Sequence, residues 1–405
     1  MDWMLRPLQS LILSPAFSRR ICLGGLLLGF AGFGAACTGM NVGDFGSTVQ
    51  PGAAPQQPDV VGTGRIKVGL ILPLSAGGNA GTAAQSMKNA AEMALAEFNN
   101  ADIQLLAKDD GGTTGGAQAA TQQALAEGAE IILGPLFAQS VAAAGQIARQ
   151  SGRPVIAFST DTSVAARGIY LLSFLPESDV NRVVGYAAST GKRSFIGMVP
   201  DNAYGTVVEA AFNQAVARRG GRIVALQRYP LDRAQRGPAV SAVAQAAATA
   251  DALFIPDGSD AADLVEALTA ARVNVKRLQL LGSGLWADPS VSSAPALEGA
   301  WYPAPDTTGY RNFAARYRKR FTLDPVQTAT LAYDSVALVA ALVKTHGTQR
   351  FSEETLTSAS GFAGVDGVFR FRSDGTNERG LAVMRVTPSG PQPVSPAARS
   401  FGSAT

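Results

Sequence analysis

The chain has 405 residues, of which 46% are hydrophobic, and a formal net charge of +3 at pH 7. A chain of this length can form two domains or one large bilobed domain, and so small a charge does not indicate a nucleic-acid partner. Its only cysteines are Cys22 and Cys37 and its only histidine is His346, which leaves little for thiol or imidazole chemistry.

The N-terminal region carries the features of a secretory signal. Two arginines precede an apolar run over residues 21–36, which ends in small residues and is followed by Cys37. The run is shorter than the roughly 20 apolar residues of a membrane-spanning helix, so we expect a signal peptide over residues 1–36. The end Gly34-Ala35-Ala36-Cys37 resembles the lipobox of bacterial lipoproteins, which implies lipidation of Cys37 and attachment to a membrane. The alternative is a plain signal peptide with an incidental cysteine.

Residues 37–64 are rich in Gly, Pro, Gln and Ser and poor in large apolar side chains. Such a segment cannot bury enough surface to offset its ordering entropy, so it predicts a flexible linker. Both cysteines lie in or beside the signal. The folded part therefore has no disulfide framework, no thiol nucleophile and no cysteine zinc site.

From residue 65 onward, short apolar runs alternate with helical patterns, which predicts βαβ units around a parallel sheet. The strands are near-continuous apolar runs, as expected for a sheet that is covered on both faces. The expected strands of this first set are 65–72, 103–107, 130–133 and 154–158, and the helices are 83–99, 117–127 and 140–150.

The alternation starts again after Glu177, which predicts a second, similar lobe. Its expected helices are 179–189, 204–219, 234–248 and 261–272, and its strands are 194–199, 222–229, 252–255 and 278–281. A long helix over 325–344 follows. The end of the domain is expected to be a β pairing of strand 368–371 with strand 381–386, through a turn at Asp374-Gly375. Residues 391–405 are expected to be a disordered tail. The fold class is therefore α/β, with two Rossmann-like lobes built on parallel sheets.

No motif indicates catalysis. His346 lies at the end of a helical pattern before Gly347, where a cation and a glycine mark a helix C-terminus. The glycine turn at 282–284 is not followed by an apolar helical pattern, so it does not predict a dinucleotide site. We therefore expect no catalytic residue, no cofactor, no metal site and no enzymatic activity.

Polar and aromatic side chains recur where the predicted strands end. In open α/β sheets, ligands bind outside the carboxyl ends of the strands, so these residues are candidates for a binding cleft for a small polar ligand. The alternative for each residue alone is capping of the following helix. The candidates are Ser75, Phe137, Ala138, Gln139, Ser159, Thr160, Asp161, Tyr204, Asp257 and Trp286.

Several segments together resemble the type I periplasmic binding proteins, the leucine/isoleucine/valine-binding family. They occur in the family's order at 66–75, 109–110, 134–136, 154–156 and 201–205. The resemblance implies a bilobed domain over 65–390, with three chain crossings as a hinge and ligand binding by closure of the lobes. It places lobe 1 at about 65–174 and 304–350, and lobe 2 at about 175–303 and 351–390.

Residue by residue, the amino-acid site of that family matches poorly. Phe137-Ala138-Gln139 stands where a serine usually holds the ligand carboxylate, Asp161 adds a like charge, and only Tyr204 is retained. The C-terminal half resembles the penicillin-binding protein activators at 297–302, 331–335 and 361–371.

That branch implies an outer-membrane lipoprotein, on the periplasmic side of the envelope, which activates a peptidoglycan synthase. The alternative is the substrate-binding protein of an ABC transporter for branched-chain amino acids or similar small polar solutes. Its partner would be an ABC permease, and the protein would be soluble in the periplasm.

Overall fold

The structure, a computed structural model, describes residues 60–98 and 101–402. The predicted signal peptide, Cys37 and all but the end of the predicted linker lie outside these residues and stay predictions. The described residues belong to one compact unit, Gln57–Thr405. Among the described residues, no helix is both long enough and apolar enough to cross a membrane.

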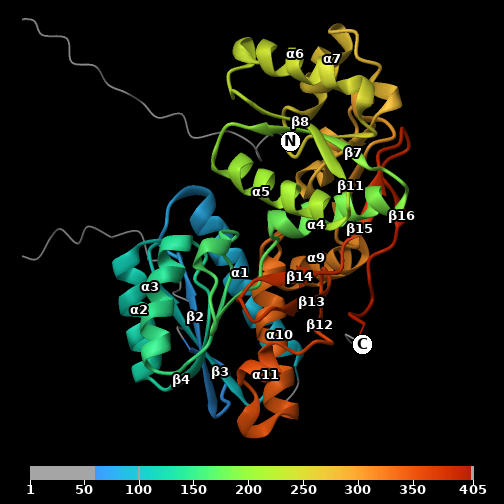
Figure 1. Cartoon of the computed structure of the whole chain (residues 1–405). Coiled ribbons are helices and arrows are strands. Elements are labelled where there is room, and N and C mark those ends of the chain that lie inside the picture. The colour runs from blue at the N-terminus through green and yellow to red at the C-terminus, as the bar shows by residue number, and fades with distance from the viewer. Residues whose placement is uncertain (1–59, 99–100, 403–405) are drawn as a thin grey trace, which may run out of the picture. The chain divides into compact units, whose positions relative to one another are not determined.

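The first lobe is built on a six-stranded sheet with the order β1-β3-β2-β4-β5-β6 (Figure 1). Strands β2 to β6 are parallel, so their carboxyl ends meet at one edge, while β1 runs antiparallel to β3. The strands are β1 (Val60–Val61), β2 (Ile66–Leu72), β3 (Ile103–Asp109), β4 (Ala129–Leu133), β5 (Val155–Ala157) and β6 (Ile169–Leu171).

Helices cover both faces of this sheet, which explains its continuous apolar strands. Leu70 and Leu72 pack into the core beneath α1 (Gly78–Glu97) and α10 (Ala329–Thr345). Ile71 points to the opposite face and packs with residues of α2 (Thr114–Ala126) and α3 (Ala138–Gln150). The predicted parallel sheet with two covered faces is therefore confirmed.

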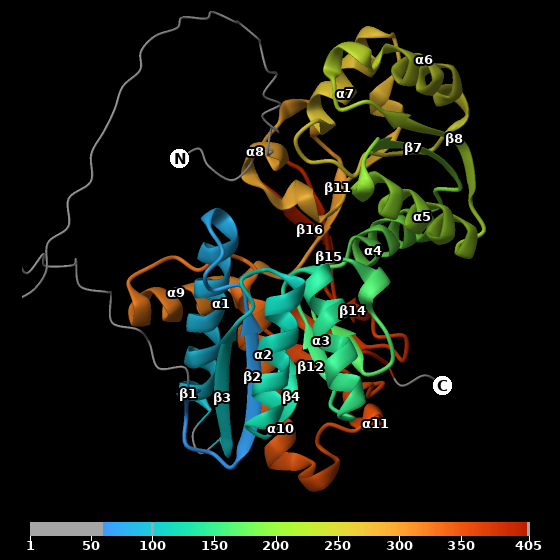
Figure 2. The same ribbon diagram turned by 90° about the vertical axis from the view of Figure 1, so that its left-hand side faces the viewer.

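The second lobe is built on a seven-stranded sheet with the order β16-β15-β11-β10-β9-β7-β8 (Figure 2). Strands β7 to β11 are parallel, whereas β15 and β16 are antiparallel to their neighbours. The strands are β7 (Ser194–Pro200), β8 (Arg222–Tyr229), β9 (Ala252–Phe254), β10 (Gln279–Leu281), β11 (Trp301–Ala304), β15 (Ala382–Arg385) and β16 (Gln392–Ser395).

Two helix pairs cover the second sheet. One face packs against α4 (Pro176–Ser189) and α5 (Ala203–Arg218), where the rings of Phe212 and Phe254 stack with centroids 4.8 Å apart. The other face packs against α6 (Gly237–Ala246) and α7 (Ala261–Ala270).

The chain passes between the two lobes three times. The passages join β6 to α4, β11 to α9 (Thr307–Phe321), and β14 (Asn377–Arg379) to β15. The predicted fold class, two parallel-sheet lobes joined by a three-strand hinge, is confirmed.

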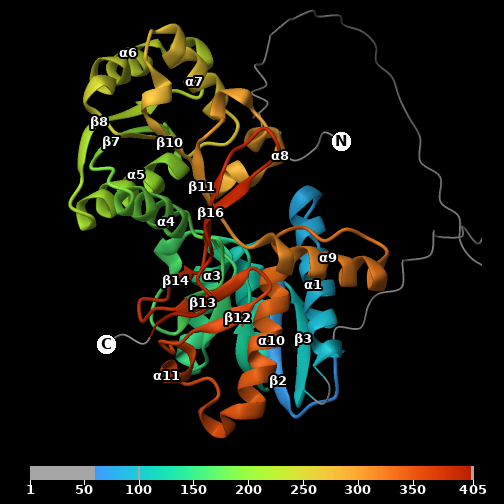
Figure 3. The same ribbon diagram turned by 90° about the vertical axis from the view of Figure 1, so that its right-hand side faces the viewer.

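The segment between α10 and β14 differs from the prediction. It contains α11 (Glu353–Leu356), β12 (Phe362–Gly364) and β13 (Gly367–Phe371), and it was expected in lobe 2. Its apolar side chains Leu356, Phe369 and Phe371 instead complete the core of lobe 1. Figure 3 shows β12 and β13 beside α10.

The predicted pairing of 368–371 with 381–386 is also wrong. Strand β13 pairs with β14, and β15 pairs with β11 in the other sheet. Strand β14 reads Asn-Glu-Arg, so it lacks the apolar alternation by which a strand is recognised.

Residues 391–402 are ordered, whereas a disordered tail was expected over 391–405. Strand β16 pairs with β15, and the ring of Phe401 lies 4.6 Å from the Arg370 guanidinium carbon. The Pro-rich composition hides this strand, although Pro393 is compatible with the edge of a sheet.

The short helix α8 (Pro289–Ser292) follows the turn after β10.

Candidate functional site

In lobe 1, Ser75 follows β2 and contacts Asp109, the last residue of the neighbouring strand β3. The Ser75 backbone N–H donates to Asp109 Oδ1 at 3.2 Å, and the N–H of Gly111 donates to the same oxygen at 2.9 Å. Partial burial raises the pKa of Asp109, but hydrogen bonds from Ser75, Gly111 and Leu74 outweigh it, so the pKa is lowered overall. Asp109 therefore stays charged and holds the exposed Ser75 in place.

The loop after β3 is fixed by the first turn of α3. Gln139 Nε2 donates to the Gly112 carbonyl at 3.0 Å. The Phe137 ring packs against Gly112 so closely that a Cβ there would lie 3.1 Å from the ring, and Gly112 has a φ of +70°. Phe137 and Gln139 thus support the loop, while Ala138 begins the helix between them. These residues stay candidates for ligand contact on their remaining surface.

Beside them, the three candidates after β5 form a local cap. The Asp161 N–H donates to Ser159 Oγ at 3.1 Å, and Asp161 Oδ1 accepts from the Ser163 N–H at 2.9 Å. Ser159 is buried, whereas Thr160 and Asp161 are exposed. The capping alternative holds for Asp161, and its second carboxylate oxygen takes no part in that cap.

In lobe 2, Tyr204 lies in the first turn of α5 and reaches the end of β10. Its hydroxyl lies 3.1 Å from Ser283 Oγ, which in turn donates to the Pro256 carbonyl at 2.5 Å. Burial raises the pKa of Tyr204, so it remains a neutral phenol. Asn202 caps the same helix through a 2.8 Å hydrogen bond from the Gly205 N–H. The three strand ends after β7, β9 and β10 are thereby joined.

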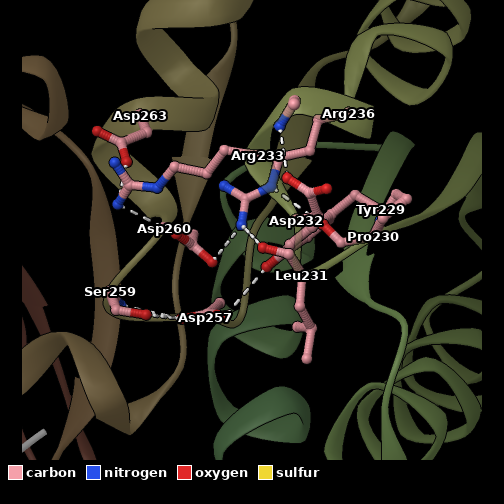
Figure 4. Close-up of polar contacts among 11 residues, drawn as sticks. Tyr229, Pro230, Leu231, Asp232, Arg233, Arg236, Asp257, Ser259, Asp260 and Asp263 are labelled. Atoms are coloured by element: carbon pink, nitrogen blue, oxygen red, sulfur yellow. Dashed lines mark hydrogen bonds and ion pairs between the residues drawn. The ribbon is translucent and has the colours of Figure 1, made fainter. Parts of the chain in front are cut away.

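Asp257 is held at the end of β9 by hydrogen bonds to both carboxylate oxygens (Figure 4). Oδ2 accepts from the Tyr229 hydroxyl at 3.2 Å, and Oδ1 accepts from the N–H and the hydroxyl of Ser259 at 2.9 and 3.0 Å. Behind it, the guanidinium of Arg236 forms a 2.7 Å ion pair with Asp260 and lies over the Tyr229 ring. This cluster fixes the loop that presents Asp257.

Trp286 is fully buried, which differs from the surface position expected of a cleft residue. Its Nε1 donates to the Asp257 carbonyl at 3.0 Å, and its ring packs on Gly282, where a Cβ would lie 2.2 Å away. Residues Gly284–Ala287 form a 3-10 turn, so consecutive side chains diverge and Leu285, not Trp286, is exposed. Trp286 therefore acts from the core, where it holds the Asp257 backbone and packs on Gly282.

Two titratable residues near the chain crossings, the half-buried Asp179 and the buried Arg379, were missed from the sequence. Asp179, in the first turn of α4, accepts the Gly284 N–H at 2.9 Å, and burial raises its pKa to about 7. Arg379 at the end of β14 donates through Nε to the Ser173 carbonyl at 3.0 Å and lies between the rings of Phe174 and Phe369. Burial lowers the pKa of Arg379. Neither residue belongs to a motif, because each gains its neighbours only through the tertiary fold.

The structure thus assembles two groups of candidates, one at the carboxyl edge of each sheet. Ser75, Phe137 and Gln139 meet through the loop after β3, while Tyr204, Asp257 and Trp286 meet through the ends of β9 and β10. That the groups share one ligand stays a prediction. Across residues 60–98 and 101–402, no three His, Cys, Asp or Glu side chains are placed to hold a metal ion.

Comparison with known proteins agrees with this architecture. A family model described as periplasmic binding protein matches residues 65–391. No curated protein sequence matches the chain.

Solved structures share the fold at low sequence identity. A Rhodospirillum rubrum protein described as a branched-chain amino acid ABC transporter has a TM-score of 0.71 at 20% identity, over 81% of this chain and 99% of that one. A Burkholderia xenovorans branched-chain amino acid ABC transporter periplasmic ligand-binding protein has a TM-score of 0.65 at 17% identity, over 83% and 96%. An R. palustris ABC transporter solute-binding protein in complex with benzoate has a TM-score of 0.55 at 18% identity, over 84% of this chain and 98% of that one.

Proposed function

We propose, since this chain belongs to the periplasmic binding protein family, that it is the substrate-binding protein of an ABC transporter. The family indicates a periplasmic location and a binding role. The similar solved structures share only the fold, but their descriptions name ABC transporters, which supports this assignment over other uses of the fold.

The observation that carries the proposal is the pair of strand-end groups. Each sheet presents polar side chains at the carboxyl ends of its parallel strands, and backbone hydrogen bonds fix them. Open α/β sheets bind ligands at this edge, and preformed polar groups give a binding site its specificity. The hinge of three chain segments suits a protein that closes on a solute.

The sequence-based expectation of a peptidoglycan synthase activator finds less support. The comparisons match the broad family over residues 65–391 and do not single out that branch. We therefore place the transporter function first.

The partner protein distinguishes the two functions. A photo-crosslinking residue on the exposed surface of lobe 1 or lobe 2 should capture an ABC permease in cells, because a substrate-binding protein must dock on its membrane partner. Capture of a peptidoglycan synthase from the same positions, with no permease, would refute the transporter assignment.

The ligand is a small polar solute, and Asp161 is expected to select against simple aliphatic amino acids. Two like charges about 4 Å apart repel by about 1 kcal/mol in water and about 4 kcal/mol at an effective dielectric of about 20. Asp161 is exposed on the edge that would receive a ligand carboxylate, so wild-type protein should bind leucine weakly or not at all.

Calorimetry with leucine tests this expectation. Asp161→Asn should bind leucine about tenfold or more tightly than wild type, since about 1.4 kcal/mol corresponds to tenfold. Asp324→Asn is the matched control, because Asp324 is an exposed aspartate in the loop between α9 and α10. Micromolar binding of leucine by wild type, unchanged in Asp161→Asn, would show that Asp161 does not face the ligand carboxylate.

A further inference from the structure

The solvent-facing side of α9 is strongly basic. Its buried side chains include Phe313 and Tyr317, which pack with Ala90 and Met93 of α1, and Figure 2 and Figure 3 show α9 beside α1. The helix contains no acidic residue, and its five cations are all exposed. These cations are Arg311, Arg316, Arg318, Lys319 and Arg320.

The C-terminal end of α9 combines this charge with an exposed apolar side chain. Arg318, Lys319 and Arg320 occupy the last turn of the helix, and Leu323 follows two residues after the helix ends. Leu323 is 59% exposed, more than any other large hydrophobic side chain among the described residues. We call residues 318–323 the basic tip. Cations in a last turn also stabilise a helix through its dipole, but that role does not require an exposed leucine beside them.

The charge of the basic tip is available to a partner. Within residues 60–98 and 101–402, neither Lys319 nor Arg320 forms an ion pair, and the Arg320 guanidinium lies over the neighbouring Phe321 ring at 5.6 Å. Arg318 lies 2.8 Å from Asp324, but these side chains are 54% and 78% exposed. Ion pairs on so open a surface contribute little, so Asp324 does not cancel the charge of the tip.

Helix α9 lies near the point where the N-terminal part of the chain enters the fold. Arg316 Nε donates to Oε1 of Glu97, the last residue of α1, at 3.0 Å. Gly62 approaches the same turn of α1, since a Cβ there would lie 2.8 Å from Leu95 Cδ2. Residues 1–59, with the predicted lipid attachment at Cys37, precede this point. The predicted flexible linker would span about 25–30 Å, so a membrane that holds Cys37 is within reach of α9.

The surface of an anionic bilayer matches the basic tip in charge and in polarity. Its negative potential attracts each nearby Lys or Arg by about 1 kcal/mol, which corresponds to about fivefold in partitioning. Long basic side chains keep their charge at the level of the headgroups, while an adjacent apolar side chain enters the interface. A basic surface is also a common second attachment for a protein that is held by a lipid chain.

We propose that the basic tip docks on the surface of an anionic phospholipid bilayer. Lys319 and Arg320 contact the phosphate groups of the lipids, and Leu323 enters the interface between them. An acidic protein surface would match the charge alone, whereas the bilayer also accounts for Leu323. The strand-end candidates take no part in this contact, so it is additional to the proposed transport function and independent of it.

Fluorescence at residue 323 tests the proposal. Full-length protein with Cys22→Ser and Cys37→Ser carries an environment-sensitive dye on Leu323→Cys, so the dye reports on the basic tip alone. The protein is mixed with vesicles of phosphatidylcholine, or of phosphatidylcholine and phosphatidylglycerol in equal parts, at an ionic strength of about 0.01 M, where screening is weak. Emission should rise with the anionic vesicles only. The same dye on Leu231→Cys, at a 57% exposed leucine of lobe 2, is the matched control and should not respond.

Removal of charge should weaken this response. In the labelled protein, Lys319→Gln with Arg320→Gln should raise the lipid concentration for half-maximal emission about 25-fold, at about fivefold for each charge. Arg149→Gln with Arg153→Gln is the matched control, because it removes two exposed arginines elsewhere in lobe 1. An ionic strength of about 1 M, where the screening length is about 3 Å, should abolish the response of the unsubstituted tip.

Three results would overturn the proposal. The first is an equal response, or none, with the two kinds of vesicle. The second is equal weakening by the two double substitutions. The third is a response to polyglutamate but not to anionic vesicles, which would assign the basic tip to an acidic protein partner. None of these results depends on solute binding, so failure of the proposed transport function would be recognised separately.

Discussion

Arg236→Leu should lower the unfolding free energy by about 3–5 kcal/mol, the usual cost of removing one partner from a buried ion pair. Arg236 is only 6% exposed, and its guanidinium lies 2.7 Å from Asp260 and donates to the carbonyls of Pro230 and Leu231. Without it, the one ion pair that Asp260 keeps among the described residues is the longer 3.5 Å contact to Arg233. The buried Asp260 carboxylate and the carbonyls of Pro230 and Leu231 would lose the guanidinium that donates to them.

Urea denaturation followed by circular dichroism measures this effect. Arg149→Leu is the control and should stay within about 0.5 kcal/mol of wild type, because Arg149 is exposed. Arg236→Leu combined with Asp260→Leu should be less destabilised than Arg236→Leu alone, since no unpaired charge remains. A loss below about 1 kcal/mol for Arg236→Leu would contradict a stabilising role of this ion pair.

Trp286→Ala should also cost about 3–5 kcal/mol, the range for removing a large buried aromatic side chain. Trp286 is fully buried, and its removal leaves a cavity over Gly282 and takes away the donor to the Asp257 carbonyl. The neighbouring Leu285 is 52% exposed, so Leu285→Ala is expected to change stability far less. The same denaturation measurement on both variants checks the expectation. Similar losses for the two would mean that Trp286 has no special role in packing.

The sheet architecture could be predicted from the sequence because parallel strands buried on both faces carry a strong apolar signal. Strand β2 is buried from Val68 to Leu72, and the strand predicted over 222–229 is the observed β8. His346 also takes the predicted position, as the C-cap of α10. These features depend on local pattern alone, which a single sequence records.

The features that were missed depend on contacts between distant segments. Strand β14 is polar and is recognisable only through its pairing with β13, and β16 only through β15. The strand-end candidates could be predicted, because the end of an apolar strand is visible in the local sequence. The residues that they contact could not be predicted, because those residues lie on other segments. Asp179 needs Gly284, and Arg379 needs Ser173, more than 100 residues away along the chain in each case.

The late segments of the chain complete both lobes, and this has a consequence for biogenesis. The core of lobe 1 requires α10 and β13, and the sheet of lobe 2 requires β15 next to β11. A nascent chain that ends before residue 329 therefore lacks a covering helix for the first sheet and an edge partner for the second. Until these late segments have been synthesised, neither lobe can complete its native fold, so the emerging polypeptide is incompletely folded. An unfolded nascent polypeptide is the form that a narrow translocation channel can admit.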